Sequence, residues 1–336
     1  MTSIVTNSSA IAALATLRTV NAGLAKTQLT VSTGYRVDKA SDNAAYWSVA
    51  TTMRSDNKAL SAVQDAIGMG AAVVDTAYEG MQSVISVTSE IKAKLVAATE
   101  TGVDKTKINE EISQLKDQLR ATISSASFNG QNWLMFGPND DPPAMSNPQI
   151  PGSFTRSSNG TVSVTMLNYN WLKDASHPNR VLVDESKYTH GAQGILTDSG
   201  YAARLGLSTG YLLLKRVTPP GTKYSALPLL PQVEIGLTAT TTTKDVTDMV
   251  SVVDSMLTDI TSAAATLGSM SKRVQSQADF VSTLRDSIQS GIGRLVDANM
   301  EEESSRLSAL QTQQQLGIQS LSIANGSTQS LLTLFR

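Results

Sequence analysis

The distribution of proline places the strongest constraint on how this 336-residue chain folds. All ten prolines lie between Pro138 and Pro231, and neither the 137 residues before this stretch nor the 105 residues after it contain one. Proline removes a backbone donor and clashes with the preceding helical turn, so helix interiors exclude it. The sequence therefore predicts two helical arms that flank a non-helical middle, a mainly α fold with a β-rich insert.

Both arms carry apolar residues at alternating spacings of three and four. The pattern runs from Leu60 to Ala98 in the first arm and from Met249 to Ala298 in the second. Because a sustained stripe of this kind requires a partner stripe, the arms are expected to form a long antiparallel coiled-coil or helical-bundle rod. The residues predicted to pack inside this rod are Leu60, Val63, Ile67, Val74, Met81, Val84, Ile91, Leu95, Met256, Ile260, Leu267, Val274, Leu284, Ile288 and Leu295.

The two ends of the chain carry weaker stripes that are rich in Ala, Thr, Gly and Gln. Such residues bury little area, so neither end is expected to be a stable helix alone, and both are expected to order on assembly. The carboxy-terminal stripe is about two positions out of phase with the long rod, which predicts a stutter or a break within residues 299–305. The residues predicted to mediate self-assembly are Leu17, Val20, Leu24, Val31, Leu307, Leu310 and Leu321.

A shorter helix is expected between the first arm and the insert. Thr101-Gly102 interrupts the preceding helix, and Asp104 is suited to cap the next one. Asn129-Gly130 is then expected to end this helix, since the pair readily takes positive φ.

The middle of the chain is expected to form a small β-rich domain. Val162 to Val164 and Val233 to Leu237 alternate as strands do, and Asn159-Gly160 is a turn signal. The predicted domains are a terminal coiled coil of residues 1–40 with 300–336, a helical rod of 41–138 with 244–299, and a projecting, surface-exposed domain of 139–243.

Composition excludes several classes of function. The absence of cysteine excludes disulfides, thiolate nucleophiles and Cys-ligated metals. A net charge of −2 provides no basic field for nucleic acid, and no apolar run reaches the roughly 18–20 residues of a membrane span. The first 17 residues contain no Lys or Arg, so a cleaved signal peptide is not expected.

The motifs that could carry chemistry are incomplete. Gly206 to Gly210 matches the Gly-x-Ser-x-Gly nucleophile elbow of the α/β-hydrolase fold. That fold requires an acidic residue and then a His later in the chain than the Ser. Both histidines, His177 and His190, precede Ser208, and neither belongs to a metal-ligand motif. No catalytic, cofactor or metal site is predicted, and the chain is not expected to be an enzyme.

Several segments resemble the flagellin family. Leu29 to Ala45 reads LTVSTGYRVDKASDNAA, similar to the flagellin amino-terminal signature, and Asp75 to Met81 resembles its helical continuation. Phe128-Asn129-Gly130 is similar to the turn that follows. At the other end, Leu321 to Asn325 and Leu331 to Arg336 resemble the closing pattern of the family.

The resemblance implies a structural subunit that self-polymerises into the bacterial flagellar filament for swimming motility. The sequence of Tyr46 to Ala50, YWSVA, most resembles that of flagellins of the α-proteobacterial type. Such a subunit is expected to be extracellular, exported without a cleaved signal peptide, and to bind itself and sister flagellins. The expected further partners are the flagellar export apparatus, a secretion chaperone, and the filament cap and junction proteins.

Three alternative functions remain open from the sequence. A hook–filament junction protein shares such termini with flagellin. Another coiled-coil assembly protein, such as a chemoreceptor signalling rod, is also a Ser- and Ala-rich helical hairpin. An enzyme embedded in the insert is the third alternative, although no catalytic constellation supports it.

Overall fold

The computed structural model describes residues 7–137, 147–170, 180–185, 194–198, 200–215 and 232–334, with side chains described up to residue 326. The described residues form two compact units, one of residues 1–59 with 284–336 and one of residues 60–283. The described chain is mainly helical, and the insert contains short strands, so the predicted fold class is confirmed. The three-domain division stays a prediction.

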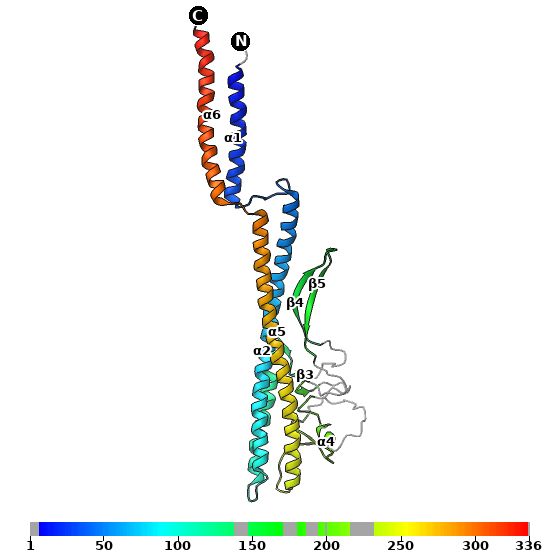
Figure 1. The fold of residues 1–336 in the computed structure, drawn as a ribbon. Helices are drawn as coiled ribbons and strands as arrows, with labels where there is room; N and C mark the ends of the chain where they lie inside the picture. Colours follow the sequence, from blue (N-terminus) through cyan, green and yellow to red (C-terminus); the bar gives the residue numbers. More distant parts are fainter. Residues whose placement is uncertain are drawn as a thin grey trace. The chain divides into compact units, whose positions relative to one another are not determined.

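In the first unit, the two ends of the chain form a pair of helices. Helix α1 (Ser8–Thr33) lies antiparallel beside α6 (Met300–Leu334), which extends beyond the start of α1 (Figure 1). The Asn7 side chain caps α1 by accepting from the Ala10 N–H, and its amide donates to the Ala324 carbonyl at 2.9 Å. These contacts fix both the start of α1 and its alignment with α6.

A non-helical joint separates α5 (Thr243–Val296) from α6, and a second one follows α1. Asn299 accepts from the Glu301 N–H at 3.2 Å, which caps α6 and places three glutamates at its electropositive end. The slip expected within 299–305 is therefore a break, and it falls at residues 297–299. The two joints are bonded to each other, because Val37 N–H donates to the Val296 carbonyl and Ala298 N–H to the Gly34 carbonyl.

A small apolar core surrounds these joints, and the predicted residues Ile288 and Leu295 pack partly buried against it. The fully buried side chains are Val37, Ala50, Ile292 and Val296. The segment after α1 places Val37 against the last turns of α5, and it therefore covers a face of the helix that the heptad pattern did not select. The predicted residues of this part of α5, Leu284, Ile288 and Leu295, are half-buried.

In the second unit, α2 (Ala44–Ala97) and α5 run antiparallel and bury the predicted stripes against each other (Figure 1). Ser271 Oγ donates to Asp75 at 2.8 Å, and Lys92 pairs with Asp254, which fixes the register of the two helices. The predicted residues that are buried here are Leu60, Val63, Ile67, Val74, Met81, Val84, Ile91, Leu95, Met256, Ile260, Leu267 and Val274.

The third helix of this unit, α3 (Lys105–Ser125), begins after the predicted cap but ends four residues before Asn129, earlier than predicted. Asp104 caps it by accepting from the Thr106 and Lys107 N–H groups. After it, Asn129 (φ 49°) and Gly130 (φ 77°) form the turn of a hairpin. The hairpin joins strands β1 (Ser127–Phe128) and β2 (Gln131–Asn132).

The insert contains three further strand pairs, each separate from the others. A short helix, α4 (Gly200–Arg204), lies among them. Only part of the strand predicted at 233–237 is a strand, and Pro142-Pro143, Pro219-Pro220, His177 and His190 lie outside the described residues. The pairs are β3 (Met135–Phe136) parallel with β6 (Val183–Asp184), β4 (Gln149–Arg156) antiparallel with β5 (Val162–Asn168), and β7 (Gly210–Leu212) parallel with β8 (Gln232–Glu234).

Two glycines within α2 are expected to respond oppositely to alanine. A Cβ at Gly80 would lie 2.7 Å from Ala126 Cβ and 2.9 Å from Leu134 Cδ1, whereas one at Gly68 would meet nothing within 4 Å. Gly80→Ala is expected to destabilise the protein by about 1–3 kcal/mol through overpacking. Gly68→Ala is expected to stabilise the protein by about 0.5–1 kcal/mol, since alanine lowers the backbone conformational entropy of the unfolded chain at this helical position. Denaturant unfolding of the monomer measures both, and equal effects would contradict the placement of Ala126 and Leu134 against Gly80.

Candidate assembly surfaces

The seam between α1 and α6 brings together the residues that the sequence predicted for self-assembly. Glycine lets the helices approach, since a Cβ at Gly23 would lie 3.6 Å from Leu310, and one at Gly317 would lie 3.2 Å from Leu17. In this seam Thr27 is buried, whereas the seven predicted residues are only half-buried. The half-buried residues are Leu17, Val20, Leu24 and Val31 on α1 and Leu307, Leu310 and Leu321 on α6.

A polar pair crosses the same two helices. Gln314 Nε2 donates to Asn21 Oδ1 at 2.7 Å. Neither residue is among the seven predicted for self-assembly. The pair is exposed to solvent, and its bond favours one alignment of the two helices.

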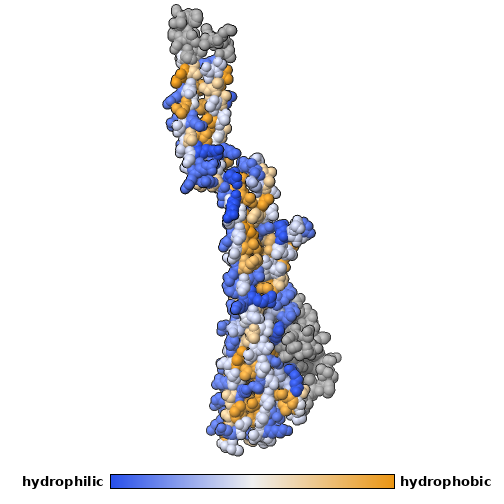
Figure 2. Space-filling view, viewed as in Figure 1, coloured by the Kyte–Doolittle hydropathy of each residue, from blue (hydrophilic) through white to orange (hydrophobic). Residues whose placement is uncertain are grey.

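Apolar side chains also cover the outside of this helix pair. On α6, Ile323 is 75% exposed, Leu316 is 57% exposed and Ile318 is 54% exposed. Apolar residues reach the surface along α1 and α6 in Figure 2. Such clustered exposure is typical of an interaction surface. The exposed apolar residues of the two helices are Ile11, Leu14, Leu29, Leu316, Ile318 and Ile323.

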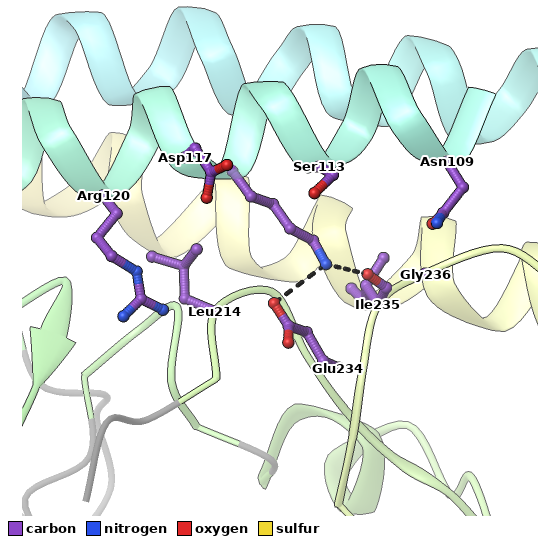
Figure 3. Close-up of a pocket in the computed structure, with 9 residues that line it drawn as sticks. Asn109, Ser113, Asp117, Arg120, Leu214, Glu234, Ile235 and Gly236 are labelled. Atoms are coloured by element: carbon purple, nitrogen blue, oxygen red, sulfur yellow. Dashed lines mark hydrogen bonds and ion pairs between the residues drawn. The ribbon is translucent and has the colours of Figure 1, made fainter. Parts of the chain in front are cut away.

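In the second unit, Lys116 of α3 anchors the insert. Its ammonium group pairs with the Glu234 carboxylate at 3.2 Å and donates to the Ile235 carbonyl (Figure 3). Asn109 lies two turns before Lys116 on the same face of α3, and its Oδ1 accepts from the Leu237 N–H at 2.8 Å. Burial lowers the pKa of Lys116, and the Glu234 charge opposes this shift. These contacts lie in a polar cavity of about 250 Å³ and fasten β8 and its following residues to α3.

A second anchor joins α4 to α5. The Tyr201 hydroxyl donates to Asp259 at 2.6 Å, and the Arg204 guanidinium lies 3.2 Å from Asp198 and 3.8 Å from Asp259. Burial raises the pKa of both Asp198 and Tyr201. The charged and polar groups here are engaged with one another, so the arrangement serves to hold the insert on the helices.

The motif at Ser208 does not form a nucleophile elbow. Ser208 is exposed, with α4 before it and β7 after it, which reverses the strand–turn–helix order that the elbow requires. Within the described part of the chain, no cluster of three or more His, Asp or Glu side chains could hold a metal ion. Among the same residues, no helix has the length and apolarity to cross a membrane.

Replacing Lys116 by methionine is expected to loosen the insert. Lys116→Met keeps the aliphatic packing but leaves the Ile235 carbonyl without its donor, at a cost of about 1–2 kcal/mol. Hydrogen exchange of residues 232–237 is expected to accelerate about tenfold. Lys107→Met, on the same helix but largely exposed, is the control and is expected to change nothing. Unchanged protection in Lys116→Met would show that β8 is held by other contacts.

The chain matches two family models that together cover most of its length. Residues 4–136 match the bacterial flagellin N-terminal helical region, and residues 250–335 match the bacterial flagellin C-terminal helical region. These ranges contain the helices α1, α2, α3 and α6 and nearly all of α5.

Similarity to individual proteins extends over the whole chain. The chain is 50% identical to flagellin C and 46% identical to flagellin A of Rhizobium meliloti (strain 1021). Each comparison covers the full length of both proteins. It is 38% identical to a flagellin of Brucella melitensis, again over the full length of both chains. With matching models at both ends and this similarity throughout, the chain belongs to the bacterial flagellin family, in its α-proteobacterial type.

Proposed function

We propose that this flagellin, a structural subunit of the flagellar filament, polymerises through its paired terminal helices. The observation that carries the proposal is the apolar surface of α1 and α6. Their seam leaves Leu17 and Leu310 half-buried, and Ile323 and Leu316 are exposed on the outside. One subunit alone cannot cover this surface, whereas neighbouring copies can, and burial of the exposed side chains offsets the entropy of ordering the ends.

The contacts between copies are of the head-to-tail kind in this proposal. A surface that binds a different surface on the next copy produces an open helical filament when the rotation from copy to copy does not close into a ring. The seven half-buried seam residues would then be covered by helices of neighbouring subunits. The terminal coiled coil would form the inner part of the filament, the rod the next shell, and the residues of the insert the outer surface.

Partners other than the subunit itself follow from the family resemblance. Flagellins A, B, C and D of Rhizobium meliloti are all similar to this chain over its full length, which supports co-assembly with sister subunits. We infer that an export apparatus, a chaperone, a cap and junction proteins handle the subunit, which becomes extracellular with its amino terminus uncleaved. The intact mass of subunits recovered from sheared filaments tests the last point, since a cleaved signal would remove 15–30 residues.

A purely structural role is the simplest interpretation of the insert. The contacts at Lys116 and at Tyr201 tie polar groups of the insert to the helices, so we assign the insert a structural role. The junction-protein alternative is not favoured, since the full-length similarity is to flagellins.

Electron microscopy of seeded polymerisation tests the proposal. The protein is dissociated by heat, returned to assembly conditions with short seeds, and compared with a version that lacks residues 1–30 and 310–336. Long filaments are expected from the intact chain only, because the truncated chain retains residues 60–283 but loses the α1–α6 surface. Filaments from the truncated chain would contradict the role given to the terminal helices.

A further inference from the structure

Three Asn-Gly pairs occur in the chain, at residues 129–130, 159–160 and 325–326. An asparagine that precedes glycine is prone to lose its side-chain amide nitrogen, because glycine has no Cβ to block the approach to its backbone nitrogen. In that reaction the backbone nitrogen of the glycine attacks Cγ of the asparagine. The folded structure decides whether it is free to do so, since an N–H held in a hydrogen bond must leave that bond before solvent can take its proton.

The pair Asn129-Gly130 forms the exposed tip of the hairpin between β1 and β2. Phe128 pairs with Gln131, so the two residues between them are the whole loop. Both have positive φ, 49° at Asn129 and 77° at Gly130, as in the tight hairpin turns that Asn-Gly favours. Of the described residues, none forms a hydrogen bond with the Gly130 N–H or with the Asn129 carboxamide. Solvent therefore reaches both reacting groups.

The pair Asn159-Gly160 is held by hydrogen bonds at both reacting groups. The Gly160 N–H donates to the Ser157 carbonyl at 2.9 Å. The Asn159 Oδ1 accepts from the Thr161 N–H at 3.1 Å and from the Thr161 hydroxyl at 2.7 Å. Asn159 is as exposed in class as Asn129, so hydrogen bonding, and not access to solvent, distinguishes the two pairs.

We propose that Asn129 is a site of spontaneous deamidation in the folded protein and that the fold protects Asn159. A base from the solvent takes the Gly130 amide proton, and the nitrogen forms a bond to Cγ of Asn129. The bond from Cγ to Nδ2 then breaks, and Nδ2 leaves as ammonia with a proton from water. The product is a cyclic succinimide. This modification is independent of polymerisation and goes beyond the proposed function.

Water then opens the succinimide at one of its two carbonyl carbons. Cleavage of the bond between Cγ and the nitrogen gives aspartate in the original backbone. Cleavage at the backbone carbonyl gives isoaspartate, whose main chain passes through Cβ and Cγ and is longer by one methylene group. The loop consists of Asn129 and Gly130 alone, so no further residue can absorb the added length. Isoaspartate is therefore expected to open the pairing of β1 with β2.

Peptide mapping of the folded monomer measures the reaction at both pairs in one sample. The protein is incubated at mildly alkaline pH, digested at acidic pH and analysed by mass spectrometry. Deamidation appears as the mass gain that accompanies replacement of NH2 by OH, and chromatography separates the isoaspartyl peptide. We expect Asn129 to react at least about fivefold faster than Asn159, the factor that corresponds to a net hydrogen bond of about 1 kcal/mol. The pair 325–326 lies in α6, which is expected to order on assembly, and is left out of this comparison.

The unfolded chain is the control for the effect of flanking residues. In guanidinium chloride the hydrogen bond from Gly160 is lost, so the two rates are expected to converge through a rise at Asn159. Equal rates in the folded protein, or a faster reaction at Asn159, would overturn the proposal. A difference that persists unchanged in guanidinium chloride would also overturn it, because the cause would then lie in the neighbouring residues and not in the fold. So would an Asn129 that reacts in the unfolded chain but stays intact in the folded one.

Discussion

Leu310→Asp is expected to abolish filament formation while the monomer stays folded. Leu310 lies on α6 against the backbone of α1 at Gly23, so the new carboxylate would be placed in an apolar seam. Desolvating a charge there costs about 3 kcal/mol or more in every subunit. Since each 1.4 kcal/mol is a factor of ten, the critical concentration is expected to rise on the order of a hundredfold. Sedimentation and electron microscopy after seeding measure the loss.

The control for this experiment is the neighbouring residue. Gln311 is exposed, so Gln311→Asp adds the same charge outside the seam and is expected to polymerise normally. The far-ultraviolet circular dichroism of both variants should remain close to that of the parent, because residues 60–283 keep their own core. Normal filaments from Leu310→Asp would refute the assignment of this stripe to assembly.

Met81→Asp is expected to have the largest effect on the monomer itself. Met81 is fully buried in the middle of α2, surrounded by the apolar stripes of the rod. A carboxylate without a partner in such a core destabilises a protein by about 4 kcal/mol or more. For a unit of about 220 residues, this corresponds to a fall in Tm of roughly 8–16 °C. Thermal unfolding followed by circular dichroism measures the shift.

The adjacent position again provides the control. Gln82 is exposed, and Gln82→Asp is expected to change Tm by less than about 2 °C. A small shift in Met81→Asp would mean that water reaches the interior of the rod at this level. The two pairs of variants also distinguish the two units. A charge in the α1–α6 seam is expected to raise the critical concentration for polymerisation, whereas a charge in the rod is expected to lower the Tm of the subunit.

The helical arms could be predicted because their signal is periodic. A core residue such as Ile91 or Leu267 is one member of a long stripe, and each stripe needs only a partner of the same kind. The cap at Asp104 and the turn at Asn129-Gly130 could be predicted for a similar reason, since each acts on residues within a few positions. In both cases the structural cause lies in the local sequence.

The complete core at the end of α5 could not be predicted, because part of its cause is distant in sequence. Ile292 and Val296 are buried in one cluster with Val37, more than 250 residues away, whereas the heptad pattern selected Leu295, which packs partly buried against that cluster. The same holds for Lys116 with Glu234 and for Tyr201 with Asp259. Each is a single pair of side chains joined by folding, and a single pair leaves no repeat in a sequence.

The bonded joints after α1 and before α6 have a mechanical consequence. When a filament rotates, force acts on each subunit along its length. If a single unpaired segment joined two helices, that segment alone would carry the force and could be stretched. Here the two connections at Val37 and Ala298 are tied side by side by backbone hydrogen bonds. Tension in this region is therefore shared by two segments of the chain, and lengthening the joint would require these hydrogen bonds to break.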